Sequence, residues 1–105
     1  MPGIFEQPWK AVYIGGSTIM VQYIVAFRSR SQTMRLFQSA KNNGIPCSII
    51  NTPREASIGC GISLCYCPDE HNQIYSLYRR GDYNALIGFF RMEKSPSWRT
   101  YINPL

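Results

Sequence analysis

One segment, residues 29–46, limits the fold more than any other, because it carries both a helix start signal and a helix stop signal. Ser29 and Gln32 have the spacing of a capping box, in which each side chain bonds to the backbone of the other residue. Gly44 suits the end of a helix, and Pro46 prevents the helix from resuming. Several side chains between these signals share one helical face: Thr33, Leu36, Phe37 and Ala40. We therefore expect a helix from residue 30 to about residue 43.

Short runs rich in β-branched and aromatic residues predict strands on both sides of this helix. The expected strands are residues 20–27, 47–51, 61–67 and 85–92. A second helix is expected between Pro68, which suits a first helical turn, and Gly81, which suits a helix end. The resulting order, βαββαβ, predicts an α+β protein of the ferredoxin-like class, with a four-stranded antiparallel sheet and two helices on one face.

The length of 105 residues fits a single domain. We expect residues 19–92 to form the ferredoxin-like domain, residues 1–18 to be an N-terminal extension, and residues 93–105 to be an irregular C-terminal tail. Two arrangements are open for residues 10–14: they pair as an extra edge strand, or this region packs Trp9 and Tyr13 against the body of the domain.

Hydrophobic residues make up 45% of the chain and charged residues 16%, a composition typical of a folded globular protein. The net charge of +5 makes anionic partners plausible, although the basic residues are scattered and also serve solubility. The longest apolar stretch, residues 19–27, is too short to cross a bilayer, and no secretory signal is recognisable. We therefore expect a cytoplasmic protein without a membrane partner, in which the four cysteines are reduced thiols.

The loop between the second and third expected strands holds the best candidate for chemistry, a cysteine between two glycines. Gly59 and Gly61 remove bulk beside Cys60 and let the backbone bend, so that a partner can reach the thiol. Arg54 lies in the same loop, and a nearby cation favours a thiolate. In the alternative interpretation, Gly-Cys-Gly is a tight turn that enters a strand, and Cys60 is a small buried hydrophobic residue.

Cys67 and Cys65 are second-choice thiols. Cys67 precedes Pro68 at an expected helix start, where backbone N–H groups stabilise a thiolate. Asp69 and Glu70 oppose this effect, because their charges disfavour another anion nearby. The alternative is that Cys67 caps the helix or lies on the face of the sheet without chemistry of its own.

Neither a metal nor a nucleic acid is favoured by the motifs. Cys60, Cys65, Cys67 and His71 are close in sequence but lack the C-x2-C spacing of structural zinc sites, so we expect no metal and no other cofactor. RNA-recognition domains with this element order stack bases on aromatic residues of the third strand, where this chain offers only Tyr66. That side chain is expected on the face that meets the helices, so we do not expect a nucleic-acid partner.

Three short strings of the sequence carry a resemblance to a known family: Phe27-Arg28-Ser29, then Asn43-Gly44-Ile45-Pro46-Cys47, then Asn51-Thr52-Pro53-Arg54 with Gly59-Cys60-Gly61-Ile62-Ser63. They resemble small bacterial proteins described as selenium/sulfur carrier-like, over residues 22–92. In that family, similar domains can follow a TusA-like sulfur-carrier domain. The resemblance implies that the site comprises Thr52, Pro53, Arg54, Gly59, Cys60 and Gly61. Cys65, Cys67 and the N-terminal extension are not features that we associate with the family.

We therefore predict a sulfur or selenium carrier in which Cys60 is the acceptor thiol and Arg54 stabilises its thiolate. The expected partner is a sulfur-donor or acceptor protein, such as a cysteine desulfurase or a TusA-like protein. We expect the chain itself to act as a carrier rather than as a turnover enzyme. The rival hypothesis is a non-catalytic interaction or oligomerisation module, such as a homodimer, in which the Gly-Cys-Gly turn is structural. A buried and unreactive Cys60 would favour the rival.

Overall fold

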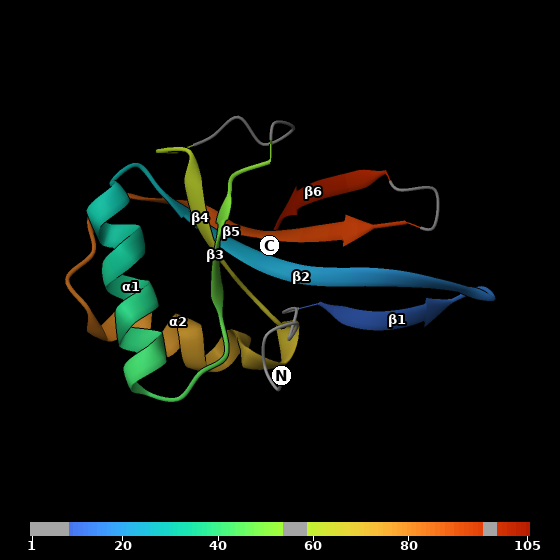
Figure 1. Cartoon of the computed structure of the whole chain (residues 1–105), viewed down its shortest axis with the longest axis horizontal. Coiled ribbons are helices and arrows are strands. Elements are labelled where there is room, and N and C mark those ends of the chain that lie inside the picture. The colour runs from blue at the N-terminus through green and yellow to red at the C-terminus, as the bar shows by residue number, and fades with distance from the viewer. Residues whose placement is uncertain (1–8, 54–58, 96–98) are drawn as a thin grey trace, which may run out of the picture.

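The computed structural model of the chain describes residues 9–53, 59–95 and 99–105. These residues form two α-helices, one short 3-10 helix and six strands (Figure 1). In chain order the elements are β1 (Lys10–Ile14), β2 (Ser17–Phe27), α1 (Arg30–Asn42), β3 (Ser48–Asn51), β4 (Ile62–Tyr66), η1 (Pro68–Glu70), α2 (His71–Arg80), β5 (Leu86–Lys94) and β6 (Thr100–Pro104). The expected α+β class is confirmed.

The sheet has the strand order β3-β4-β2-β5-β6, with β1 paired to β2 in addition, and every pair is antiparallel. The sheet therefore has two strands more than the four predicted for the domain: β6, which was not expected, and β1, which was an open alternative. Strand β6 also corrects the prediction of an irregular tail at residues 93–105, because residues 100–104 pair along β5 and Ile102 packs on the sheet. Residues 10–14 form the edge strand, one of the two arrangements left open for them. Of the other arrangement, Trp9 does pack against the sheet, whereas Tyr13 is exposed.

Strands β1 and β4 share one edge of β2. Strand β4 pairs with Tyr23–Ala26 of β2, whereas β1 pairs with the preceding part of β2, from residue 17 to residue 21. The opposite edge of β2 pairs with β5 from residue 20 to residue 27. The helices lie beside one half of the sheet, and β1, β2, β5 and β6 extend beyond them (Figure 1).

Only one of the two hydrogen bonds of the predicted capping box forms at the start of α1. The side-chain oxygen of Ser29 accepts a hydrogen bond from the backbone N–H of Gln32 at 3.2 Å, as a helix N-cap does. The Gln32 side chain, however, does not return to Ser29. Its oxygen accepts from the N–H groups of Asn84 and Ala85 at 3.2 and 3.0 Å. Gln32 therefore ties the start of α1 to the segment that leads into β5.

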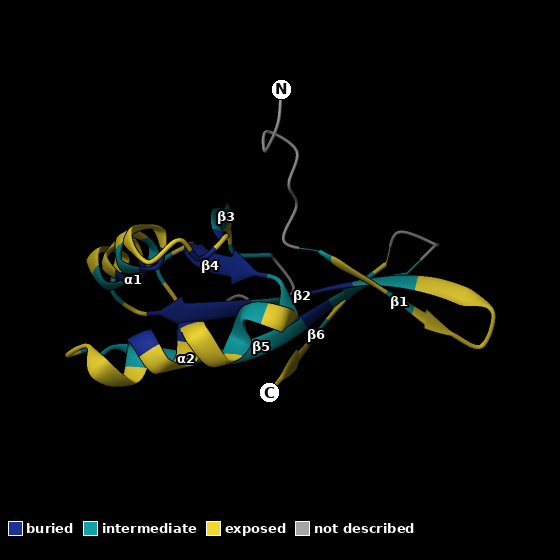
Figure 2. Cartoon of the chain, turned by 90° about the horizontal axis from the view of Figure 1, so that it is seen from below, coloured by how far each residue is buried: buried dark blue, intermediate teal, exposed yellow. Residues whose placement is uncertain are grey.

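Apolar side chains cover both faces of the sheet. The buried residues include the whole of β4 and part of β2 (Figure 2). On one face, both helices join a single core with alternate residues of β2 and β4: Val25, Phe27, Leu36, Ala40, Leu64, Tyr66, Ile74 and Leu77. On the other face a smaller cluster contains Ile24, Cys65 and Met92, against which Trp9 and Ile102 pack. The alternation along β4 thus assigns Tyr66 to the helices and Cys65 to the opposite face, as the sequence predicted.

Candidate functional site

The Gly-Cys-Gly turn is attached to the ends of two strands. The backbone N–H of Cys60 donates to the carbonyl oxygen of Phe27, the last residue of β2, at 3.3 Å. The N–H of Thr52, directly after β3, donates to the carbonyl oxygen of Gly61 at 2.9 Å. Because the chain passes from β2 into α1 at this same end of the sheet, the turn lies next to the start of α1.

Gly59 is required for two separate reasons. Its φ of +79° lies in the left-handed region, which residues with a Cβ rarely adopt. In addition, a Cβ at this position would lie 2.7 Å from the carbonyl oxygen of Phe27, which is closer than Cβ atoms approach an oxygen to which they are not bonded. Gly61 has a φ of +93°, but nothing lies within 4 Å of the position that a Cβ would take. The contact with Phe27 therefore depends on glycine at 59 alone.

The half-buried Cys60 side chain points at the first turn of α1. Its sulfur lies 4.0 Å from Oγ1 of Thr33 and 3.7 Å from the carbonyl oxygen of Ile62. The Thr33 hydroxyl also donates to the carbonyl oxygen of Ser29 at 3.3 Å. A protonated Cys60 can then donate to Ile62, whereas a deprotonated Cys60 can accept the proton of the Thr33 hydroxyl instead.

The charges around this turn favour an anion. The N-terminal end of a helix carries a partial positive charge, and the first turn of α1 contains no acidic residue. Arg28 and Arg30 flank the N-cap, and both are exposed. Thr33, Arg28 and Arg30 were not predicted as site residues. Their place follows from the element order, which brings the β2–α1 junction and the β3–β4 loop to one end of the sheet.

The other residues predicted for this loop have different places. Arg54 lies outside the described residues. The hydroxyl of Thr52 forms a hydrogen bond with that of the fully buried Ser63 at 2.7 Å, so Thr52 anchors the loop to β4. Pro53 follows it and is half-buried. The structure therefore brings Thr52, Gly59, Cys60 and Gly61 together at one end of β4.

Cys67 lies past the other end of β4, far from this turn. It is half-buried and precedes η1, so that a 3-10 turn separates it from α2. Lys10 of β1 forms an ion pair with Asp69 at 2.6 Å, and both side chains are exposed. The hydrogen bond from Lys10 is the main cause that lowers the pKa of Asp69, and the Cys67 thiol adds a smaller contribution. A thiol, a carboxylate and an ammonium group thus meet here.

The remaining thiols are buried. Cys65 is 1% exposed in the second apolar cluster, and burial raises its pKa to about 12. Cys47 belongs to the core beneath the helices, and burial raises its pKa as well. Both environments suppress thiolate chemistry. No three side chains among His, Cys, Asp and Glu come together as a metal site in the part of the chain that is described.

His71, named above only as a possible metal ligand, is half-buried among aromatic rings. Its Nδ1 lies 2.8 Å from the hydroxyl of Tyr66, and the rings of Tyr23, Tyr75 and Phe89 contact it as well. Burial lowers the pKa of His71. This histidine therefore belongs to the packing between α2 and the sheet.

Fold and site define a small α+β protein with a half-buried thiol in a glycine turn beside a helix N-terminus. The family described as "Putative Se/S carrier protein-like" matches residues 22–85, which include all four cysteines. This chain belongs to that family, and the resemblance noted in the sequence is confirmed. Strands β1, β5 and β6 lie outside the matched residues. No curated protein and no solved structure matches the chain. Neither helix described here is long and apolar enough to cross a membrane.

Proposed function

We propose that this protein carries sulfur or selenium, bound to Cys60. The observation that carries the proposal is the position of the Cys60 sulfur, 4.0 Å from the Thr33 hydroxyl at the positive end of α1. A carrier thiol needs a partner to reach it, and Cys60 is half-buried in a turn between two glycines, beside the N-terminal end of α1. Membership of the family supports the same assignment.

Persulfide transfer to Cys60 needs no oxidant. The Cys60 thiolate attacks the outer sulfur of a persulfide on a donor protein. The new S–S bond forms on Cys60, the donor's S–S bond breaks, and the donor's own sulfur leaves as a thiolate. The small residues Gly59 and Gly61 leave room for the donor's sulfur. Arg54 is proposed as the charge partner in this step, with Pro53 and Thr52 shaping the loop.

A cysteine desulfurase or a TusA-like protein fits as donor or acceptor, and the cytoplasm is the compartment in which these thiols would stay reduced. The order β3-β4-β2-β5 supports assignment of the central strands to the ferredoxin-like class, with β1 and β6 as additions at the edges. We place the carrier domain at residues 19–92, and the family match over residues 22–85 supports these limits.

The test is the intact mass of the protein after incubation with a cysteine desulfurase and cysteine. We expect an added sulfur that a reductant removes. The addition should be lost in Cys60→Ser and retained in Cys65→Ser and Cys67→Ser. If the parent gains no sulfur, or if Cys60→Ser gains as much as the parent, Cys60 is not the carrier.

The close fit of Gly59 against Phe27 favours a second candidate, in which the turn is purely structural and the protein is an interaction module. In that case Cys60 reacts slowly with thiol reagents in the folded protein, whereas a carrier thiol reacts readily. The same turn geometry serves both roles, so the reactivity of Cys60 discriminates between them.

A further inference from the structure

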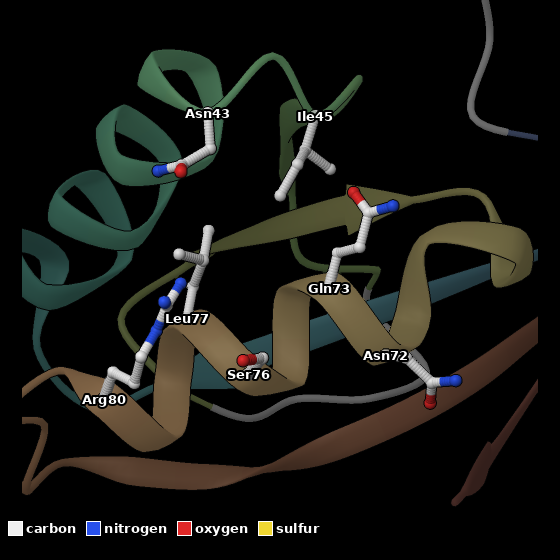
Figure 3. Close-up of a pocket in the computed structure, with 7 residues that line it drawn as sticks. All are labelled: Asn43, Ile45, Asn72, Gln73, Ser76, Leu77 and Arg80. Carbon is white, nitrogen blue, oxygen red and sulfur yellow. The ribbon is translucent and has the colours of Figure 1, made fainter.

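A groove of about 330 Å³ lies between α1 and α2 (Figure 3). It is at the opposite end of α1 from Cys60, and a helix of 13 residues is about 20 Å long. The apolar part of the groove is formed by the buried side chains Ile45 and Leu77. Exposed polar side chains complete it: Asn43, Asn72, Gln73 and Ser76. A partner can therefore make both apolar contacts and hydrogen bonds here.

Arg80 supplies the positive charge of the groove, and Figure 3 shows its side chain directed towards α1. Among the described residues, Arg80 has no hydrogen-bond or ion-pair partner, and the two ion pairs found there use Lys10 and Arg91 instead. The neighbouring Arg79 differs, because its guanidinium lies 3.5 Å from the hydroxyl of Tyr75. Arg80 is thus the arginine of this pair that is available to a ligand.

The surrounding charge is positive as well. The sequences of α1 and α2 contain five basic residues and no acidic one: Arg30, Arg35, Lys41, Arg79 and Arg80. Three features oppose an anion: the C-terminal end of α1, Glu70 before α2, and the exposed Asp82, two residues after Arg80. At the end of α1, the carbonyl groups of Ala40 and Lys41 already accept hydrogen bonds from following N–H groups. These bonds weaken the repulsion between the end of α1 and an anion. Glu70 lies before α2, at the end of that helix away from Arg80, whereas Asp82 lies two residues beyond Arg80.

We propose that this groove docks an acidic segment of a partner protein. A carboxylate of the partner binds the planar guanidinium of Arg80, and an adjacent aliphatic side chain covers Ile45 and Leu77. A peptide fits better than a nucleic acid, because none of the groove's lining residues is an aromatic on which a base could stack. A protein surface fits better than a small metabolite, because the basic residues extend along both helices beyond the groove.

The docking site does not depend on the proposed chemistry of Cys60. Because the groove and the glycine turn lie at opposite ends of α1, a segment bound in the groove leaves Cys60 uncovered. The site would serve a sulfur carrier and an interaction module equally, and its failure would leave the carrier hypothesis untouched.

Amide NMR of the whole chain tests the proposal. The probe is a capped hexapeptide of alternating glutamate and leucine, with a glutamine–leucine peptide as the uncharged control. We expect the acidic peptide to shift the amide signals of Gln73, Ser76 and Arg80, and the control peptide to shift them far less. Arg80→Gln should weaken binding at least fivefold, and the charge-matched variant Arg79→Gln less than twofold. Both changes are at exposed positions, and the spectra themselves report whether the variants are folded.

Three results would overturn the proposal. Equal losses in Arg80→Gln and Arg79→Gln would mean that net charge alone attracts the peptide. Amide shifts that centre on Arg28 and Arg30 would show that the acidic peptide binds at the other end of α1. Stronger binding of a single-stranded oligonucleotide of equal charge, at the same amides, would identify the groove as a nucleic-acid site.

Discussion

The hydroxyl of Tyr66 lies 2.8 Å from Nδ1 of His71 and joins β4 to the first turn of α2. Burial raises the pKa of Tyr66, so the hydroxyl keeps its proton. A protonated hydroxyl can donate a hydrogen bond to Nδ1 or accept one from it, according to the histidine tautomer. Burial of His71 lowers its pKa and so favours the neutral imidazole in this pair.

This pair predicts a loss of stability in mild acid. Burial lowers the pKa of His71 below its ordinary value of 6.5, so the unfolded chain binds a proton more readily than the folded protein. Neutral His71 therefore contributes to the free energy of unfolding. This contribution is complete above pH 6.5 and is lost as the pH falls through the folded-state pKa of His71. Urea unfolding should give a smaller free energy of unfolding at about pH 5 than at about pH 7.5. His71→Gln can still accept from Tyr66 but does not titrate, so it should remove this slope. An unchanged slope in that variant would contradict the assignment.

The Phe27 contact predicts that the two glycines of the turn differ in their tolerance of a side chain. Gly59→Ala combines a left-handed backbone with a clash, and we expect it to reduce the free energy of unfolding by about 2–4 kcal/mol. Gly61→Ala, the matched control, has the left-handed backbone alone and should cost about 1–2 kcal/mol. Chemical denaturation of both variants measures the difference. Equal costs would show that the approach of residue 59 to Phe27 does not constrain the turn.

The four cysteines should divide into two reactive and two protected thiols. Cys60 and Cys67 are half-buried, whereas Cys65 and Cys47 lie in the two apolar clusters with a raised pKa. In the folded protein at neutral pH, a disulfide reagent should therefore modify two thiols quickly and the other two only after a denaturant is added. Mass mapping of the modified peptides identifies them. Rapid modification of Cys65 in the folded protein would contradict the observed packing.

The sequence was most informative where local signals decide the structure. Ser29 and Gly44 limit α1 through their own backbone and side-chain preferences, and both limits were predicted to within one residue. The predicted hydrogen bond from the Gln32 side chain back to Ser29 does not form. Gln32 bonds instead to residues 84 and 85, which are far away in the chain. Strand β6 was missed for a similar reason. Residues 100–104 become a strand by pairing with β5, and no local pattern reports that pairing.

The candidate site shows the same division. The bend at Gly-Cys-Gly followed from the glycines themselves, because their backbone freedom is a local property. The contact of Cys60 with Thr33 did not, because it depends on how a strand end and a helix start meet in three dimensions. The helical spacing predicted that Thr33 faces inwards, which is correct, but spacing cannot tell which atoms are found there.

The contact between Thr33 and Cys60 gives the sharpest test of the site. A valine at 33 has nearly the same shape as threonine but no hydroxyl, so it cannot donate to a Cys60 thiolate. One such hydrogen bond contributes about 1 kcal/mol, so Thr33→Val should slow the alkylation of Cys60 roughly fivefold. Thr33→Ser keeps the hydroxyl and is the control. The rate is measured with iodoacetamide in a Cys67→Ser background, where Cys60 is the accessible thiol. If the valine variant reacts as fast as the parent, the hydroxyl has no part in activating Cys60. If the serine variant is slowed as much as the valine variant, packing rather than the hydrogen bond is responsible.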